Sequence, residues 1–278
     1  MEGISERAQR IAEEIIRRTA CDHYRIVLNE ERAPSITDSK IGGAPYWPAD
    51  KPYPVDNQGK PMLMIMQVNC AKAHLQSPLP EQGMIQWYIS LNPEFMYGCR
   101  GNFDDEGNGF RVVYHETVNG DNSPAGVPTH SSVDEMLTPV KREVAIDVVT
   151  EQTIMSVSDG RFNRIFFDIV QEITGAEHQG KMWYEYLDNE DCLYFEKNLG
   201  MQRPRHQMLG YPVFDQDDAR RDIQRHDVLL FQLASQHSVI DRKELVMWGD
   251  MGNGFIFVNH DDLMALDFTH AYYCWDCG

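Results

Sequence analysis

The 278-residue sequence contains no apolar run that approaches the roughly 18 residues of a membrane-spanning helix. Its first residues, MEGISERAQRIAEE, are charged and lack the apolar stretch of a secretory signal. The six cysteines are scattered, and without an export signal we expect them to be free thiols. The sequence therefore predicts a cytoplasmic protein with no membrane partner.

Catalytic signatures are also absent. The sequence has no phosphate-binding G-x-x-x-x-G-K-[ST], no G-x-G-x-x-G, no H-E-x-x-H and no G-x-S-x-G. Its histidines show no metal-ligand spacing. Catalytic groups can still converge from distant segments, so an enzyme is disfavoured and not excluded. We predict no catalytic residues, no cofactor and no metal.

Basic residues are scarce, with 25 Lys and Arg against 43 Asp and Glu, for a net charge of −18. Such a surface repels nucleic acid. It attracts a basic protein or peptide. The acidity can alternatively serve solubility alone. The oligomeric state is left open.

Helical periodicity occurs at three places. Apolar residues recur at three- and four-residue steps over 4–20, which predicts an amphipathic helix capped by Ser5. A second helix is expected over 159–174, begun by Ser158 or Asp159 and ended by Gly175. A shorter, charged helix is expected over Asp217–Arg225, and Asp261 is expected to cap a turn.

Short runs rich in β-formers lie between turn clusters, which predicts strands. Some features recur in the same order in both halves of the chain. The first half contains, in order, Gly43-Ala44-Pro45-Tyr46-Trp47, the run LMIMQV with its Gln67, and Gly83. The second half contains the corresponding Gly210-Tyr211-Pro212-Val213-Phe214, the run VLLFQL with its Gln232, and Gly252. Self-similarity of this kind indicates an internal duplication. A Gln inside a buried strand must be hydrogen-bonded, so we interpret both as buried structural residues bonded to backbone, with a pocket-lining role as the alternative.

The predicted fold class is therefore α+β and β-rich, with mixed or antiparallel sheets from an internal duplication and a few packed helices. We expect residues 1–278 to form a single globular unit. Residues 1–150 would be the first half, an N-terminal helix plus the first repeat. Residues 151–278 would be the second half, a helix plus the second repeat.

The same residues resemble a known family. Six segments are similar to the YwqG-like family of bacterial proteins. They are SKIGGAPYWP (39–48), LMIMQVNC (63–70), HQMLGYPVFDQD (206–217), LLFQLAS (229–235), WGDMGNGFIFVNHDDL (248–263) and LDFTHAYYCWDC (266–277). The resemblance implies a β-rich α+β fold in mostly cytosolic proteins of unknown function. It implies no activity, cofactor or catalytic residue, and it is weakest over residues 116–205.

Six residues are candidates for a ligand-binding site. His206 and the acidic run that holds Asp215 and Asp217 flank the second Gly-x-Pro, and Asp250 lies among three glycines in WGDMGNGF. Asp can bind a cation or a ligand hydroxyl, although an Asp in a glycine-rich turn can equally bond its own backbone. Trp47 and Trp248 complete the set, because aromatic side chains are favoured at binding surfaces.

Two further motifs have simpler explanations. FDDEGNGF (103–110) partly imitates a calcium loop, but His115 stands where the bidentate glutamate belongs, so an acidic turn before a strand is the better interpretation. Cys274 and Cys277 form a C-x-x-C that ends an apparent strand, whereas redox pairs normally begin a helix. We expect two partly buried thiols there.

The stretch MWYEYLDNEDCLYFE (182–196) mixes aromatic and acidic residues. It suits a surface that recognises a basic, partly apolar partner. The alternative is strands whose aromatic residues fill the core. The leading hypothesis is a non-catalytic binding protein for a basic protein or peptide, for example one that neutralises a basic toxin. The alternative function is an enzyme or small-ligand-binding protein with a polar site between the halves.

Overall fold

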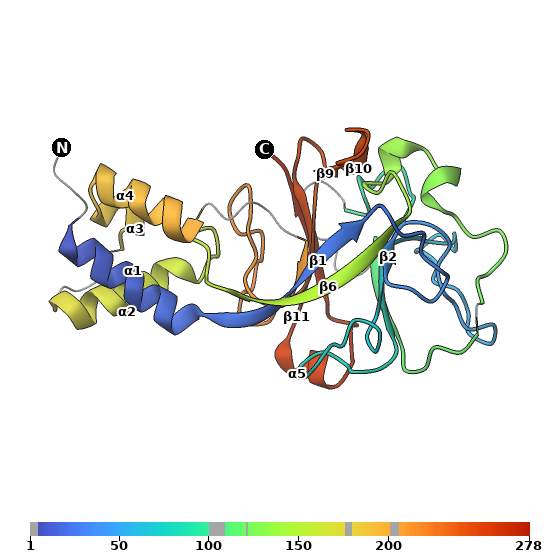
Figure 1. Cartoon of the computed structure of the whole chain (residues 1–278), viewed down its shortest axis with the longest axis horizontal. Coiled ribbons are helices and arrows are strands. Elements are labelled where there is room, and N and C mark those ends of the chain that lie inside the picture. The colour runs from blue at the N-terminus through green and yellow to red at the C-terminus, as the bar shows by residue number, and fades with distance from the viewer. Residues whose placement is uncertain (1–4, 100–108, 121, 176–179, 201–205) are drawn as a thin grey trace.

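The computed structural model describes residues 5–99, 109–120, 122–175, 180–200 and 206–278 (Figure 1). A group of helices lies at one end of the molecule and a large antiparallel sheet at the other. Two long strands, β1 (Cys21–Asn29) and β6 (Val144–Thr153), pair along their whole length and run from the helices into the sheet. The β1–β6 pair therefore connects the two parts.

The sheet has ten strands, all paired antiparallel. Across the sheet the order is β12 (Tyr272–Asp276), β11 (Asn253–Val258), β8 (Val228–Ala234), β7 (Gln207–Met208), β1, β6, β2 (Lys40–Ile41), β3 (Leu63–Asn69), β4 (Met84–Ile89) and β5 (Phe110–His115). Four strands thus lie on each side of the central β1–β6 pair. Two short strands, β9 (Gln236–His237) and β10 (Glu244–Val246), form a separate hairpin. The prediction of a β-rich α+β fold is confirmed.

The main hydrophobic core lies where the two ends of the sheet pack on each other. The Trp87 ring of β4 stacks on the ring of Trp248 at 5.6 Å between centroids and meets the edge of Tyr273 in β12 at 5.4 Å. Every residue of β3 and of β4 is buried. A strand buried on both faces requires a continuous apolar run, and the run LMIMQV that holds Gln67 lies in β3 as expected.

The helices form a second hydrophobic core. The helix α1 (Glu6–Thr19) begins where the Ser5 hydroxyl accepts a hydrogen bond from Ala8 N at 3.1 Å, as predicted. The helix α2 (Phe162–Thr174) ends at Gly175, whose φ of 72° is left-handed. Residues of α1 and α2 share one buried cluster with α3 (Trp183–Tyr186) and α4 (Asn189–Phe195). Helices from both halves of the sequence therefore pack together, while the division at residue 150 stays a prediction.

Some local predictions are wrong. Residues 217–225 form turns and no helix, because the Asp218 and Asp222 carboxylates accept hydrogen bonds from backbone N–H groups two residues ahead. Residues 182–196 form α3 and α4, so the strand alternative for that stretch fails. Asn259, not Asp261, caps α5 (His260–Met264). The N-cap of α2 is Arg161, without a side-chain cap, and not Ser158 or Asp159.

Candidate functional site

His206 is enclosed by the β-structure of the second half. Its Nδ1 accepts a hydrogen bond from Ala234 N at 3.0 Å, and its Nε2 lies 2.7 Å from Gln236 Oε1. Burial lowers the pKa of His206 to about 4, because a charged ring would lose its hydration there. The neutral His206 ring is hydrogen-bonded through both nitrogens, so it links the segment before β7 to the end of β8 and to Gln236.

The two tryptophans of the candidate set are buried in different places. The Trp47 ring packs on Tyr53 and His115 on the outer face of the first half, and its Nε1 donates to Lys51 O at 2.9 Å. Trp248 lies in the main core, stacked on Trp87. Neither ring faces solvent, so both serve packing in this conformation.

The glycines around Asp250 make room for this packing. A Cβ on Gly254 would lie 2.4 Å from Trp248 Cζ2, and one on Gly252 would lie 1.8 Å from Asp276 O. Asp250 itself is exposed, and its backbone carbonyl accepts from Gly278 N at 3.3 Å. The glycine-rich motif is thereby explained by the close approach of Trp248 and of β12 to the backbone.

Asp215 belongs to a small polar cluster on β11 and β12. Asn253 Nδ2 donates to Asp215 Oδ2 at 2.8 Å, and Asp276 Oδ2 accepts from Asp215 N at 2.7 Å and from Gln216 N at 3.3 Å. Burial raises the pKa of Asp215 and of Asp276 above the ordinary range. Asp276 was not a candidate, because one acid in a C-terminal aromatic strand carries no spacing signal. Asp217 is exposed beside this cluster.

Both repeated glutamines are fully buried and bonded to backbone. Gln67 Oε1 accepts from Tyr46 N at 2.9 Å, and its Nε2 donates to Ile36 O and Asp38 O. Gln232 Oε1 accepts from Val213 N at 3.1 Å, and its Nε2 donates to Val213 O at 3.3 Å. Each amide therefore holds the residue after the proline of its own Gly-x-Pro turn.

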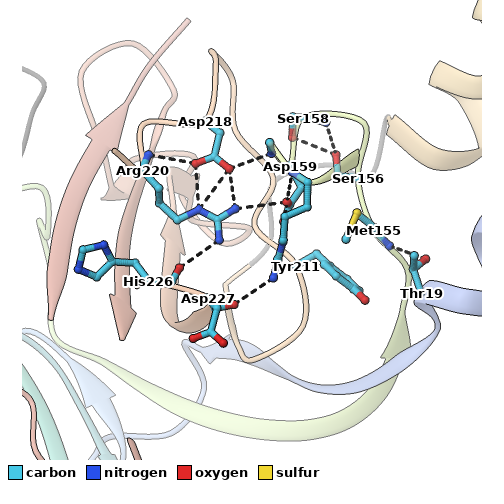
Figure 2. A network of polar contacts seen from close by, with 12 residues as sticks. Thr19, Met155, Ser156, Ser158, Asp159, Tyr211, Asp218, Arg220, His226 and Asp227 are labelled. Carbon is cyan, nitrogen blue, oxygen red and sulfur yellow. Dashed lines mark hydrogen bonds and ion pairs between the residues drawn. The ribbon is translucent and has the colours of Figure 1, made fainter. Parts of the chain in front are cut away.

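Sequence reasoning missed a network of buried charges between the start of α2 and the turn before β8 (Figure 2). The side chains of Asp159 and Arg220 are fully buried, and Arg220 Nη2 lies 3.3 Å from Asp159 Oδ1. Arg220 Nε also donates to Asp218 Oδ1 at 2.9 Å, and Arg161 Nε donates to Asp159 Oδ1 at 2.8 Å. The Asp218 carboxylate accepts from Gly160 N at 2.9 Å. These pairs join the start of α2 to the turn before β8.

The environment of this network favours a structural role. The Arg220 guanidinium lies 4.7 Å from the centre of the Phe257 ring, and Arg161 lies 5.3 Å from that of Tyr211. Burial disfavours the charge of Arg161, but the Asp159 carboxylate outweighs it and raises the pKa of Arg161. Each of the four charged side chains faces an opposite charge. The network therefore holds the start of α2 against the turn before β8.

Three hollows in the described surface are lined by other residues. One of about 670 Å³ lies among Thr37, Asn69, Lys72 and residues 116–120. A second, of about 540 Å³, lies beside β5, and a third, of about 480 Å³, lies on α1. None of the six candidate residues lines any of the three. Over the described residues, no three His, Cys, Asp or Glu side chains are grouped so that they could hold a metal ion.

The cysteines of the C-x-x-C pack against different clusters, Cys274 from within β12 and Cys277 from just after it. Cys274 packs in a small separate cluster with Phe214, Phe255 and Phe257, whereas Cys277 packs against the main core. Both are free thiols, and burial raises the pKa of Cys274. The expectation of free cysteines is confirmed. The calcium-like motif lies, apart from its last two residues, outside the described part of the chain.

The helices α3 and α4 present an acidic surface with exposed apolar side chains. Tyr184 is 53% exposed and Leu193 is 65% exposed, although Trp183 and Phe195 of the same helices are buried. Cys192 Sγ donates to Tyr184 O at 3.5 Å, which brings the two helices together. This α3–α4 surface is defined by its exposed members: Met182, Tyr184, Glu185, Asp188, Glu190, Leu193 and Glu196.

The fold and these contacts define an α+β protein in which an antiparallel sheet carries a helical module. A family model described as a domain of unknown function, DUF1963, matches residues 39–277, and the chain belongs to this family. The match starts one residue before β2 and includes the rest of both halves. No curated protein matches the chain. In the described residues no helix has the length and apolar character needed to cross a membrane.

Proposed function

We propose that the chain is a non-catalytic binding protein that recognises a basic protein or peptide through its α3–α4 surface. The observation that carries this proposal is the exposure of Tyr184 and Leu193 among carboxylates. Apolar side chains that are exposed together and rimmed by polar residues are typical of interaction surfaces. A concrete version is the neutralisation of a basic toxin.

Charge supports the choice of a basic partner. Glu190 and Glu196 each lie three residues from Leu193, so their carboxylates flank it along the helix surface. The whole chain carries a net charge of −18, which accelerates encounter with a cationic partner and repels an anionic one. The apolar side chains would then supply the buried centre of the contact.

The test is a comparison of two variants in capture experiments at low and high salt. The surface variant carries Tyr184→Ser, Glu190→Gln and Glu196→Gln. The matched control carries Val239→Ser, Glu31→Gln and Glu81→Gln, which remove an exposed apolar side chain and change the net charge equally on the β part. We expect the wild type and the control to retain basic proteins at low salt and to lose them at high salt.

The surface variant is expected to retain at least tenfold less of the same proteins at low salt. The proposal fails if the captured proteins are acidic, if they resist salt, or if both variants lose them equally. In the last case net charge alone would explain the retention.

The alternative, an enzyme or small-ligand-binding protein with a polar site between the halves, stays a prediction. Its residues have separate surroundings in the structure, since His206 is enclosed while Asp217 and Asp250 are exposed on turns. No observation on the described residues favours this alternative over binding through α3–α4.

We also infer an internal duplication. Support comes from the sheet order, which places β2 and β7 on opposite sides of the β1–β6 pair, and from the backbone bonds of Gln67 and Gln232. Trp47 and Phe214 each pack in a small outer cluster of their own half. A superposition of 39–115 on 206–276 tests the idea: it must place Gln67 on Gln232 and Trp47 on Phe214.

Membership of the YwqG-like group, a bacterial source and a cytoplasmic location are further proposals. They rest on the sequence segments that resemble that group and on the free cysteines. Fractionation of the source cells tests the location, and recovery in a membrane or secreted fraction would contradict it.

A further inference from the structure

Strand β5 is one edge of the ten-stranded sheet. The hydrogen bond from Ser90 N to Gly109 O, at 2.7 Å, fixes which residues of β5 bond to β4. Opposite residues in an antiparallel pair alternate between bonded and non-bonded. Arg111, Val113 and His115 therefore turn their backbone groups toward β4.

The intervening residues of β5, which are Phe110, Val112 and Tyr114, turn their backbone N–H and C=O groups away from β4. The orientation of Phe110 agrees with this, because its carbonyl accepts from the Arg111 guanidinium at 2.6 Å and not from β4. The N–H and C=O groups of Val112 and Tyr114 then face outward, and among the described residues no further strand pairs with them. Such an edge is a template for one more strand.

A hollow of about 540 Å³ lies along this edge. Phe110–Tyr114 form one wall and Leu266–Thr269 form the other. Val112, Tyr114 and Phe268 are only partly buried against the main core, and Leu266 is exposed. The hollow thus combines unpaired backbone with apolar side chains, the two features by which a sheet edge binds an extended peptide.

We propose that this β5 groove binds an extended, apolar peptide segment with basic ends, which adds a strand to the sheet at Val112 and Tyr114. The Asp267 carboxylate on the rim, held by Thr269 N at 2.9 Å, favours a Lys or Arg at the end of the segment. A second copy of the chain is a poorer occupant, since each copy carries a net charge of −18. This site is separate from the α3–α4 surface and does not depend on it.

The probe is the fluorescein-labelled peptide KVTVTVK, with binding followed by anisotropy and by amide chemical shifts of the wild-type protein. We expect binding, with shifts concentrated at residues 110–114 and 266–269. Two further peptides carry N-methyl groups on alternate amides. The one whose methyl groups face β5 should bind at least tenfold more weakly, and the other should change less. The peptide EVTVTVE should also bind at least tenfold more weakly.

A matched pair of protein variants tests the same edge. Val112→Pro removes an N–H that does not bond to β4, so the sheet should remain intact while KVTVTVK binding falls at least tenfold. Val112→Ile keeps the N–H and should bind like the wild type. Circular dichroism and the melting temperature show whether Val112→Pro folds, and the methylated peptides test the proposal with wild-type protein if it does not.

Four results of the binding experiments would overturn the proposal. They are the absence of KVTVTVK binding at millimolar concentration, shifts elsewhere on the protein, equal affinity of both methylated peptides, and equal affinity of EVTVTVE. Sedimentation that shows a dimer of the wild type but a monomer of Val112→Pro would make a second copy the occupant, and would also overturn it.

Discussion

The Arg220 guanidinium is a buried charge that depends on acidic partners. It is fully buried between the Asp159 and Asp218 carboxylates. We predict that Arg220→Met lowers the free energy of unfolding by about 3–5 kcal/mol, because it leaves the buried Asp218 carboxylate without its cation, whereas Asp159 keeps Arg161. Urea denaturation followed by circular dichroism measures the change.

Arg164→Met is the matched control. Arg164 is 82% exposed and lies 3.9 Å from Asp168 one helical turn away, a pair that contributes at most about 0.5 kcal/mol. If Arg220→Met is no less stable than this control, the buried network is unnecessary for stability.

The sequence indicates these charged residues but not their pairing. Asp159 has the position of a helix cap and Arg220 that of a residue on a solvated helix. Residues 159–161 and 218–220 are far apart in the chain, and only the tertiary fold brings them within hydrogen-bond distance. Local patterns therefore could not reveal the network.

The two glutamine-bearing strands, β3 and β8, allow a comparison between elements. Gln67 bonds to backbone at 2.7–2.9 Å, whereas the contacts of Gln232 with Val213 are 3.1 and 3.3 Å. We predict that Gln67→Met destabilises the protein more than Gln232→Met, because it leaves three better-bonded backbone groups unsatisfied. Gln67→Met should lower the free energy of unfolding by about 2–3 kcal/mol. Denaturant titration of both variants measures the order, and the reverse order would contradict the prediction.

At the scale of elements the sequence predicts most of the sheet and the two long helices. The strands buried on both faces and the amphipathic helices carry strong patterns. The central strand β1 does not, because Asp22, His23 and Arg25 interrupt its apolar residues and five of its nine residues are not fully buried. Its pairing with β6 across more than a hundred residues depends on tertiary structure.

For the whole molecule, the net charge can be counted from the sequence, but where acidic and apolar side chains gather on the surface cannot be read from it. The sequence does single out 182–196 as acidic and aromatic, but it does not show that Trp183 and Phe195 turn inward while Tyr184 and Leu193 turn outward. The six ligand-binding candidates share no pocket among the three described, because spacing in the chain does not report which side chains a sheet buries.

The stability of the whole molecule should depend on pH through its buried histidines, of which His206 and His115 both have a pKa lowered to about 4. The pKa of His206 is about 4 in the folded protein and near 6.5 in the unfolded chain. The unfolded state therefore binds more protons between pH 6.5 and 4, and stability falls as the pH is lowered through that range. This one group accounts for a loss of about 2 kcal/mol between pH 7 and pH 5.

Other groups act in the opposite direction. The raised pKa values of Asp215 and Asp276 favour the folded state on acidification, and protonation of carboxylates also reduces the repulsion within a chain of net charge −18. The test is therefore the difference between the wild type and His206→Gln in denaturant unfolding at pH 7 and pH 5. We expect the wild type to lose about 2 kcal/mol more than the variant over this interval. The exposed His237→Gln should follow the wild type, and equal pH dependence of all three proteins would rule out His206 as the source.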